Sequence, residues 1–211
     1  MGRTESLLVR LTLAILCPVS LFIAMWWTSA ALSIYQWLPI SDSMIGIIAL
    51  AGLALGLVLD VLFLARWTAA FYRADVRLLV LLYLFWSAIA VAFLMGLPLG
   101  NLGLGTLAGL YVGRRQRHQQ AHGQALVKTV RNASLFTALV TAAEALPIGL
   151  LALREQFAVD TLRTLFGLDP GTVAGLLGVT LIILLCLLLM AVQFGCTQAA
   201  AIAAFGLGGK E

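Results

Sequence analysis

The sequence predicts an all-α integral membrane protein, a bundle of six transmembrane helices with both termini in the cytoplasm. The composition and the placement of the basic residues predict this class. Of the 211 residues, 62% are hydrophobic and 10% are charged, whereas a soluble domain has about 45–50% apolar and about 25% charged residues. So few charges could not cover so much apolar surface in water, so we expect the bilayer to be the solvent. We treat residues 1–211 as a single polytopic membrane domain.

Five apolar stretches have about the 20 residues that a helix needs to cross about 30 Å of hydrocarbon. These stretches are residues 11–27, 44–65, 76–95, 134–153 and 171–194. Between the third and the fourth lies the segment GLPLGNLGLGTLAGLYVGRRQRHQQ, residues 96–120, which begins with glycines and ends with arginines. We expect its apolar part, over residues 99–112, to form a short glycine-rich sixth span.

The basic residues indicate that this segment crosses the membrane. If it crosses and the N-terminus is inside, 11 of the 13 basic residues lie on the cytoplasmic side, as the positive-inside rule requires. If it does not cross, the bias disappears. The localisation predicted is therefore a cell membrane, of the bacterial inner-membrane type. Outside, the segment REQFAVDTLRTLFGL that begins at Arg154 is expected to form an amphipathic helix on the membrane surface.

Glycines at a spacing of four predict close helix packing in the membrane. Gly52 and Gly56 share a face of the second stretch, and Gly105, Gly109 and Gly113 share a face of the short span. Asn101 near the start of that span is a candidate helix cap. Two interpretations remain open for the short span: a buried packing helix, or a discontinuous helix that lines a site.

An acid in the fourth long stretch is the first candidate for chemistry. Glu144 follows Arg131 by 13 positions and precedes Arg154 by 10, which places it near the bilayer midplane. A charged acid there costs about 2.5–3.5 kcal/mol on insertion scales. Thr137 and Thr141 share its helix face, so we expect a cation or proton site to which these hydroxyls contribute. The alternative is a protonated Glu144 that hydrogen-bonds a neighbouring helix as a packing contact.

Asp60 is a second acid within an apolar stretch and lies on the face that carries Gly52 and Gly56. We expect its carboxylate to point into the bundle. It would either pair with an arginine from the inner end or form part of a proton or ion path. Asn101 is a further candidate polar ligand in such a path.

The sequence indicates neither an enzyme nor a nucleic-acid-binding protein. The spans contain no histidine, no Ser/His pair and no glycine-rich phosphate loop. His118 and His122 could share a metal ion on a helix, but no cysteine or acid lies nearby, and we interpret their segment as a solvated basic helix. We therefore expect no catalytic residue, no cofactor and no metal site.

Two functions remain. The first is a small transporter or channel for a small solute or cation, coupled through Glu144 and Asp60. The second is a non-catalytic membrane subunit that binds a solute or docks a partner through its glycine-rich faces. The basic stretch from Arg114 to Arg131 would then be its docking surface in the cytoplasm. In size, number of spans and topology the chain resembles the substrate-binding subunits of energy-coupling-factor vitamin transporters, which would imply the second function. We expect the lipid bilayer as a partner, and the glycine faces permit a homo-oligomer.

Overall fold

The computed structural model of the chain describes residues 3–94, 98–121, 123–153, 164, 167 and 176–206. In these residues every regular element is a helix. The amphipathic surface helix expected after Arg154 lies outside the described residues.

Five of the described helices are long and apolar enough to cross a membrane, which indicates a membrane-embedded protein. They are α1 (Arg3–Ile34), α2 (Asp42–Ala70), α3 (Val76–Phe93), α5 (Gln124–Ala152) and α8 (Leu176–Gly206). The glycine-rich segment also forms a helix, α4 (Gly100–His118). Because α4 does not belong to these five, the sixth span stays a prediction.

Most of the helices extend well beyond the apolar stretches that predict them. The first helix has 32 residues, and Pro18 lies inside it without ending it. The fifth helix begins at Gln124, ten positions before the apolar stretch, just after Gly123 with its positive φ of 61°. Between Gln124 and Ser134 there is no glycine or proline, so nothing in the backbone interrupts the helix there.

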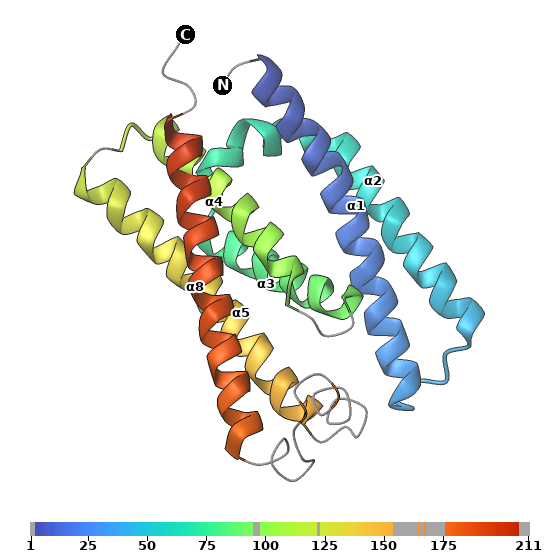
Figure 1. The fold of residues 1–211 in the computed structure, drawn as a ribbon. Coiled ribbons are helices and arrows are strands. Elements are labelled where there is room, and N and C mark those ends of the chain that lie inside the picture. The colour runs from blue at the N-terminus through green and yellow to red at the C-terminus, as the bar shows by residue number, and fades with distance from the viewer. Residues whose placement is uncertain are drawn as a thin grey trace. The chain divides into compact units, whose positions relative to one another are not determined.

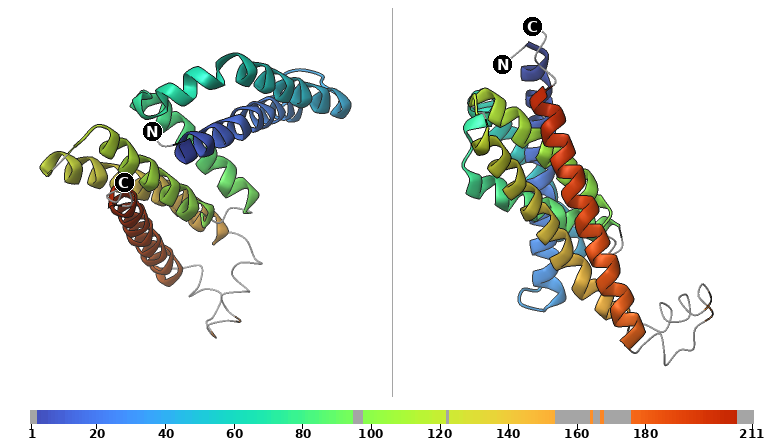
Figure 2. Two further views of the ribbon diagram at one scale, coloured as in Figure 1. Left: turned by 90° about the horizontal axis from the view of Figure 1, so that it is seen from above. Right: turned by 60° about the vertical axis from the view of Figure 1, so that its left-hand side comes forward.

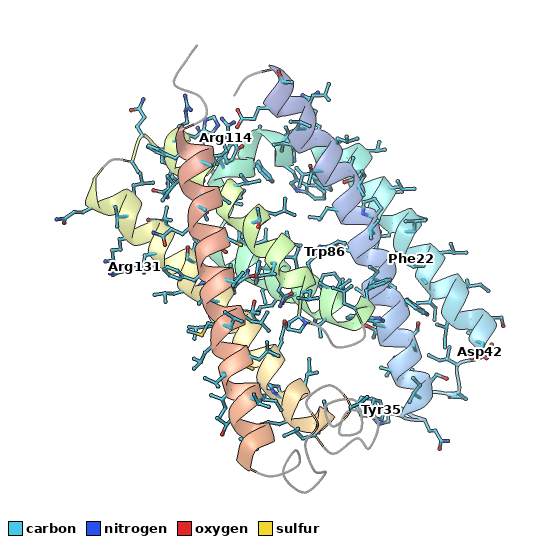
Figure 3. All side chains as sticks on the ribbon, in the orientation of Figure 1. Phe22, Tyr35, Asp42, Trp86, Arg114 and Arg131 are labelled. Carbon is cyan, nitrogen blue, oxygen red and sulfur yellow. The ribbon has the colours of Figure 1, made fainter. Side chains whose placement is uncertain are left out.

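Contacts between the helices divide the chain into two units, Met1–Ala74 and Asp75–Glu211. In the first unit, α1 and α2 form an antiparallel hairpin (Figures 1 and 2). Tyr35 and Asp42 lie at the end of this hairpin where the two helices are joined (Figure 3). At the other end, the Tyr72 hydroxyl donates a hydrogen bond of 2.7 Å to Glu5 Oε1. This bond ties the start of α1 to the short helix η1 (Phe71–Arg73).

Glycines bring the backbones of the hairpin into contact. A Cβ atom on Gly56 would overlap Pro18, and one on Gly52 would lie 2.6 Å from the Leu21 carbonyl oxygen. Real Cβ atoms essentially never approach other heavy atoms so closely. Any larger residue at these two positions would therefore have to push α1 and α2 apart.

The second unit consists of α3, α4, α5 and α8, whose directions alternate. Along α4, Gly105 lies against Thr197 and Gly113 lies against Ala204, so α4 runs parallel to α8. The α5 helix runs antiparallel to α8, because Thr137 contacts Thr197 while Gly149 contacts Ile182. Figures 1 and 2 show α5 and α8 side by side.

The α4 helix begins level with the middle of α8. The Gln193 side chain, near the centre of the 31-residue α8, bonds the carbonyl oxygen of Asn101 in the first turn of α4. At the other end, Arg117 Nη1 donates to the Phe205 carbonyl oxygen at 3.4 Å. The α4 helix therefore accompanies only the C-terminal half of α8, and its first turn lies among the side chains of the second unit.

Candidate functional site

Glu144 lies where α3, α4 and α5 meet. The Ser87 hydroxyl of α3 is 2.8 Å from Glu144 Oε1 and 2.9 Å from Oε2, and Asn101 Nδ2 of α4 donates to Oε2 at 2.5 Å. Ser87 and Asn101 have no exposed surface. A hydroxyl has one proton, so Ser87 donates to one carboxylate oxygen at a time, or accepts from Glu144 when the acid is protonated. The same contacts are therefore compatible with Glu144 as a carboxylate and as a neutral acid.

The first turn of α4 differs from the expectation that Asn101 is its cap. The N-cap position belongs to Leu99, which makes no side-chain cap bond, and Asn101 is already inside the helix. The amides of Asn101 and Leu102 bond the carbonyl oxygens of Pro98 and Leu99 in tight turns, so the Asn101 side chain remains available for Glu144. The partial positive charge of a helix N-terminus also favours a carboxylate at this place.

A glutamine in the middle of α8 completes the arrangement. Gln193 Nε2 donates to the Asn101 carbonyl oxygen at 2.9 Å and lies 3.4 Å from the Tyr83 hydroxyl of α3. Gly105 makes room for it, because a Cβ atom at that position would overlap Gln193 Nε2. We call this set the polar cluster; its members are Tyr83, Ser87, Asn101, Glu144 and Gln193.

The polar cluster has more hydrogen-bond acceptors than donors. Asn101 Oδ1 and Gln193 Oε1 are buried and accept no hydrogen bond within the described residues. The hydrogen bonds that Glu144 accepts in this part of the chain come from neutral side chains. Leaving a buried acceptor without a donor costs about 1–3 kcal/mol. The arrangement is therefore suited to a ligand that brings positive charge or donors.

The two threonines expected beside Glu144 have other partners. Thr137 Oγ1 bonds the Ser134 carbonyl oxygen at 3.1 Å and Thr197 Oγ1 at 2.9 Å. Thr141 Oγ1 donates to the Thr137 carbonyl oxygen, one turn back in the same helix. The structure thus joins Thr137 to α8, whereas the described bonds of Thr141 stay within α5.

Asp60 belongs to the first unit, on the face of α2 where Gly52 and Gly56 meet α1. It is 6% exposed, and neither carboxylate oxygen has a hydrogen-bond partner. Among the described residues, no arginine forms a hydrogen bond with Asp60, so the pair with an inner arginine stays a prediction. Cys17 lies beside Asp60, yet its Sγ is assigned to the Gly56 carbonyl oxygen at 3.9 Å.

Pro18 in α1 leaves a backbone carbonyl oxygen without its usual amide donor, at the level of Asp60. Gly52 lies against Leu21 and Gly56 against Pro18, so Asp60, one turn further along α2, is level with the turn that begins at Ala14. Pro18 has no amide proton and cannot bond the Ala14 carbonyl oxygen. The Ala14 carbonyl oxygen, in the turn level with Asp60, therefore lacks the amide donor that any other residue at position 18 would supply.

Sequence reasoning missed the members of the polar cluster on α3 and α8. Ser87 and Gln193 are isolated polar residues in helices that are otherwise strongly apolar, within LFWSAIA and LLMAVQFG. A buried polar residue in a span needs a partner, so both could have been marked as candidates. What could not be read from the sequence is which helices bring them to Glu144.

The described residues contain no group of three or more His, Cys, Asp or Glu side chains that could hold a metal ion. His118 is exposed at the end of α4, and His122 lies outside the described residues. A metal site shared by these two histidines therefore falls outside the described residues.

Comparisons with protein-family models, with curated proteins and with solved structures give no match. The function must therefore be inferred from the arrangement of the residues themselves.

Proposed function

We propose that the protein is a small membrane transporter or channel that carries a proton or a cation through the intramembrane acid Glu144. One observation carries the proposal: a carboxyl group in the middle of a long apolar helix is held by neutral donors from two other helices. A purely structural acid in hydrocarbon is normally paired with a cationic side chain or bonded as a neutral acid. The hydrogen bonds described for Glu144 involve no cationic side chain.

The topology that we propose is six crossings with both termini in the cytoplasm. The alternating directions of α3, α4, α5 and α8 support it, because successive crossings must alternate. The α4 helix is short and starts beside Gln193, in the middle of α8. In the proposed topology it would therefore begin inside the bilayer, below the outer membrane surface. A helix start of this kind inside the bilayer is characteristic of transporter sites.

Asp60 is the second acid of the proposal and belongs to the other unit. Its burial without a hydrogen-bond partner is compatible with a group that takes up and releases a proton. We assign Glu144 the main role, since it is the acid with side-chain ligands from neighbouring helices.

The experiment that tests the proposal is a flux measurement in liposomes that contain the purified protein. Wild type, Glu144→Gln and Asp60→Asn are compared for proton and alkali-cation flux across a range of pH. We expect Glu144→Gln to abolish flux while leaving the protein folded. Absence of flux in the wild type for every ion tested would contradict the proposal.

The second candidate is a non-catalytic membrane subunit that docks a partner at its cytoplasmic side. The observation in its favour is that α5 begins with an exposed basic segment, in which Lys128 and Arg131 lie on the surface. A subunit of this kind would tolerate Glu144→Gln and would lose its partner when Lys128 and Arg131 are both replaced by Gln. Co-purification of the partner measures this directly.

A further inference from the structure

The orientation of two side-chain amides determines what the polar cluster can bind. Asn101 Nδ2 and Gln193 Nε2 are both engaged as donors. When Glu144 is ionised, a turned-over Asn101 amide would point its oxygen at the Glu144 carboxylate. A turned-over Gln193 amide would point its oxygen at the Asn101 carbonyl oxygen, so the network then fixes both orientations. Asn101 Oδ1 and Gln193 Oε1 are therefore the acceptors that remain, and both are fully buried.

The charge of the cluster limits the ligand further. Glu144 is its single carboxylate, and the hydrogen bonds described for Glu144 involve no lysine, arginine or histidine. One monovalent cation would neutralise this charge, whereas a divalent cation would leave one positive charge in a medium of low dielectric constant. Divalent cations are typically held by several carboxylates and waters.

We propose that the polar cluster binds one monovalent alkali-metal cation, with the Glu144 carboxylate, Asn101 Oδ1 and Gln193 Oε1 as its oxygen ligands. This inference rests on the proposed function and narrows its solute from a proton or a cation to a dehydrated monovalent cation. The ligands come from α4, α5 and α8, so binding would join three helices of the second unit. Ammonium shares this chemistry, because it also offers positive charge to oxygen acceptors, and the test separates the two.

A binding experiment that needs no transport tests the inference. The purified full chain is unfolded thermally in detergent micelles while choline chloride is replaced stepwise by sodium chloride, at constant pH and chloride concentration. Lithium, potassium, ammonium, magnesium and calcium chloride form the other series. Because a ligand that binds only the folded state stabilises it, we expect a saturable rise in Tm with at least one alkali cation. Ammonium alone raising Tm would overturn the assignment to a metal cation.

Two variants locate the site. Glu144→Gln keeps the shape of the side chain and removes its charge, so the cation-dependent rise in Tm should disappear. The double variant Glu144→Gln with Asn101→Asp exchanges amide and carboxylate between two hydrogen-bonded side chains, and should restore the rise. Asp42→Asn, which neutralises an exposed acid outside the polar cluster, is the control and should keep the cation-dependent rise in Tm.

Besides stabilisation by ammonium alone, four results would overturn the inference. The first is a folded wild type whose Tm does not rise with any particular cation, and the second is a rise in Tm that persists in Glu144→Gln. The third is a larger rise in Tm with magnesium or calcium than with the monovalent ions. The fourth is a folded double variant whose Tm does not rise. If Glu144→Gln alone fails to fold, the double variant still decides, because it retains the charge.

The same measurements separate this inference from the proposed function. Proton flux that depends on Glu144, without cation-dependent stabilisation, would overturn the inference and leave the proposed function in place. Cation-dependent stabilisation without any flux would support the binding site and contradict the transport proposal.

Discussion

The half-buried Glu144 and the buried Asp60 differ at the level of single residues. Glu144 receives bonds from Ser87 and Asn101, whereas both carboxylate oxygens of Asp60 are buried without a partner. Removing charge at Glu144 disturbs a network, and removing it at Asp60 breaks no described hydrogen bond of its carboxylate. The two acids therefore make a natural pair for mutagenesis.

Asp60→Asn should leave the free energy of unfolding unchanged or raise it. The substitution removes the cost of a buried carboxyl group and breaks no hydrogen bond that the described residues make to its oxygens. Chemical denaturation in detergent micelles measures the effect. A loss of about 3–5 kcal/mol, which is typical of breaking a buried ion pair, would show that Asp60 has a cationic partner after all.

Ser87→Ala should lower the free energy of unfolding by about 1–3 kcal/mol, because Glu144 loses a donor in a buried site. Ser20→Ala is the matched control, since the Ser20 hydroxyl is buried and has no hydrogen-bond partner in the described residues. That control should be neutral or stabilising. Equal changes in the free energy of unfolding for the two substitutions would contradict the hydrogen bond between Ser87 and Glu144.

The sequence identifies some residues of the site and not others, for a physical reason. Glu144 and Asn101 are conspicuous as polar residues in apolar segments, and the structure brings them into contact. The contact of Ser87 with Glu144 joins positions 57 apart in the sequence. Only the packing of the helices decides such a pairing, and spacing along one chain cannot supply it.

At the level of elements, the glycine face of α4 determines how closely it approaches α8. A Cβ atom on Gly109 would overlap the Thr197 carbonyl oxygen, whereas nothing lies within 4 Å of such an atom on Gly103. In the same helix, alanine is favoured over glycine by about 1 kcal/mol. Gly103 and Gly109 thus have the same helix propensity and differ only in how closely they pack against other residues.

Gly109→Ala should therefore destabilise the protein by about 1–3 kcal/mol through overpacking, while Gly103→Ala should be neutral or stabilising. Chemical denaturation of both variants in the same detergent measures the difference. If Gly109→Ala were as stable as Gly103→Ala, the close contact of α4 with α8 would be refuted.

The apolar stretches predict where helices lie but not where they end. The prediction that the protein is all-helical with long apolar helices is confirmed. The ends differ because the backbone continues its hydrogen bonds through the polar flanks, as in the 29-residue α5. Composition alone identifies the apolar residues that would lie in the hydrocarbon core. It does not identify the polar residues that continue the helices on either side.

At the level of the whole molecule, the placement of arginines and lysines is the basis of the six-crossing topology. It requires the turn after α1 and the turn after α4 to lie on opposite sides of the membrane. Gln36 and Gln119 are exposed in these two turns. They offer a direct test of whether α4 crosses.

Cysteine labelling in oriented vesicles should separate these two positions. In a background without Cys17, Cys186 and Cys196, Gln36→Cys should react with an impermeant maleimide from the outside. Gln119→Cys should react only after the membrane is opened. Reaction of both cysteines from the same side would mean that α4 does not complete a crossing.

The central claim is that Glu144 carries the charge that the protein moves. Its most direct test is cation and proton flux in liposomes, measured for wild type, Glu144→Gln and the double variant Glu144→Gln with Asn101→Asp. We predict that flux is lost in the single variant and returns in the double variant, because the exchange restores one carboxylate to the polar cluster. Unchanged flux in a folded Glu144→Gln protein would contradict the account.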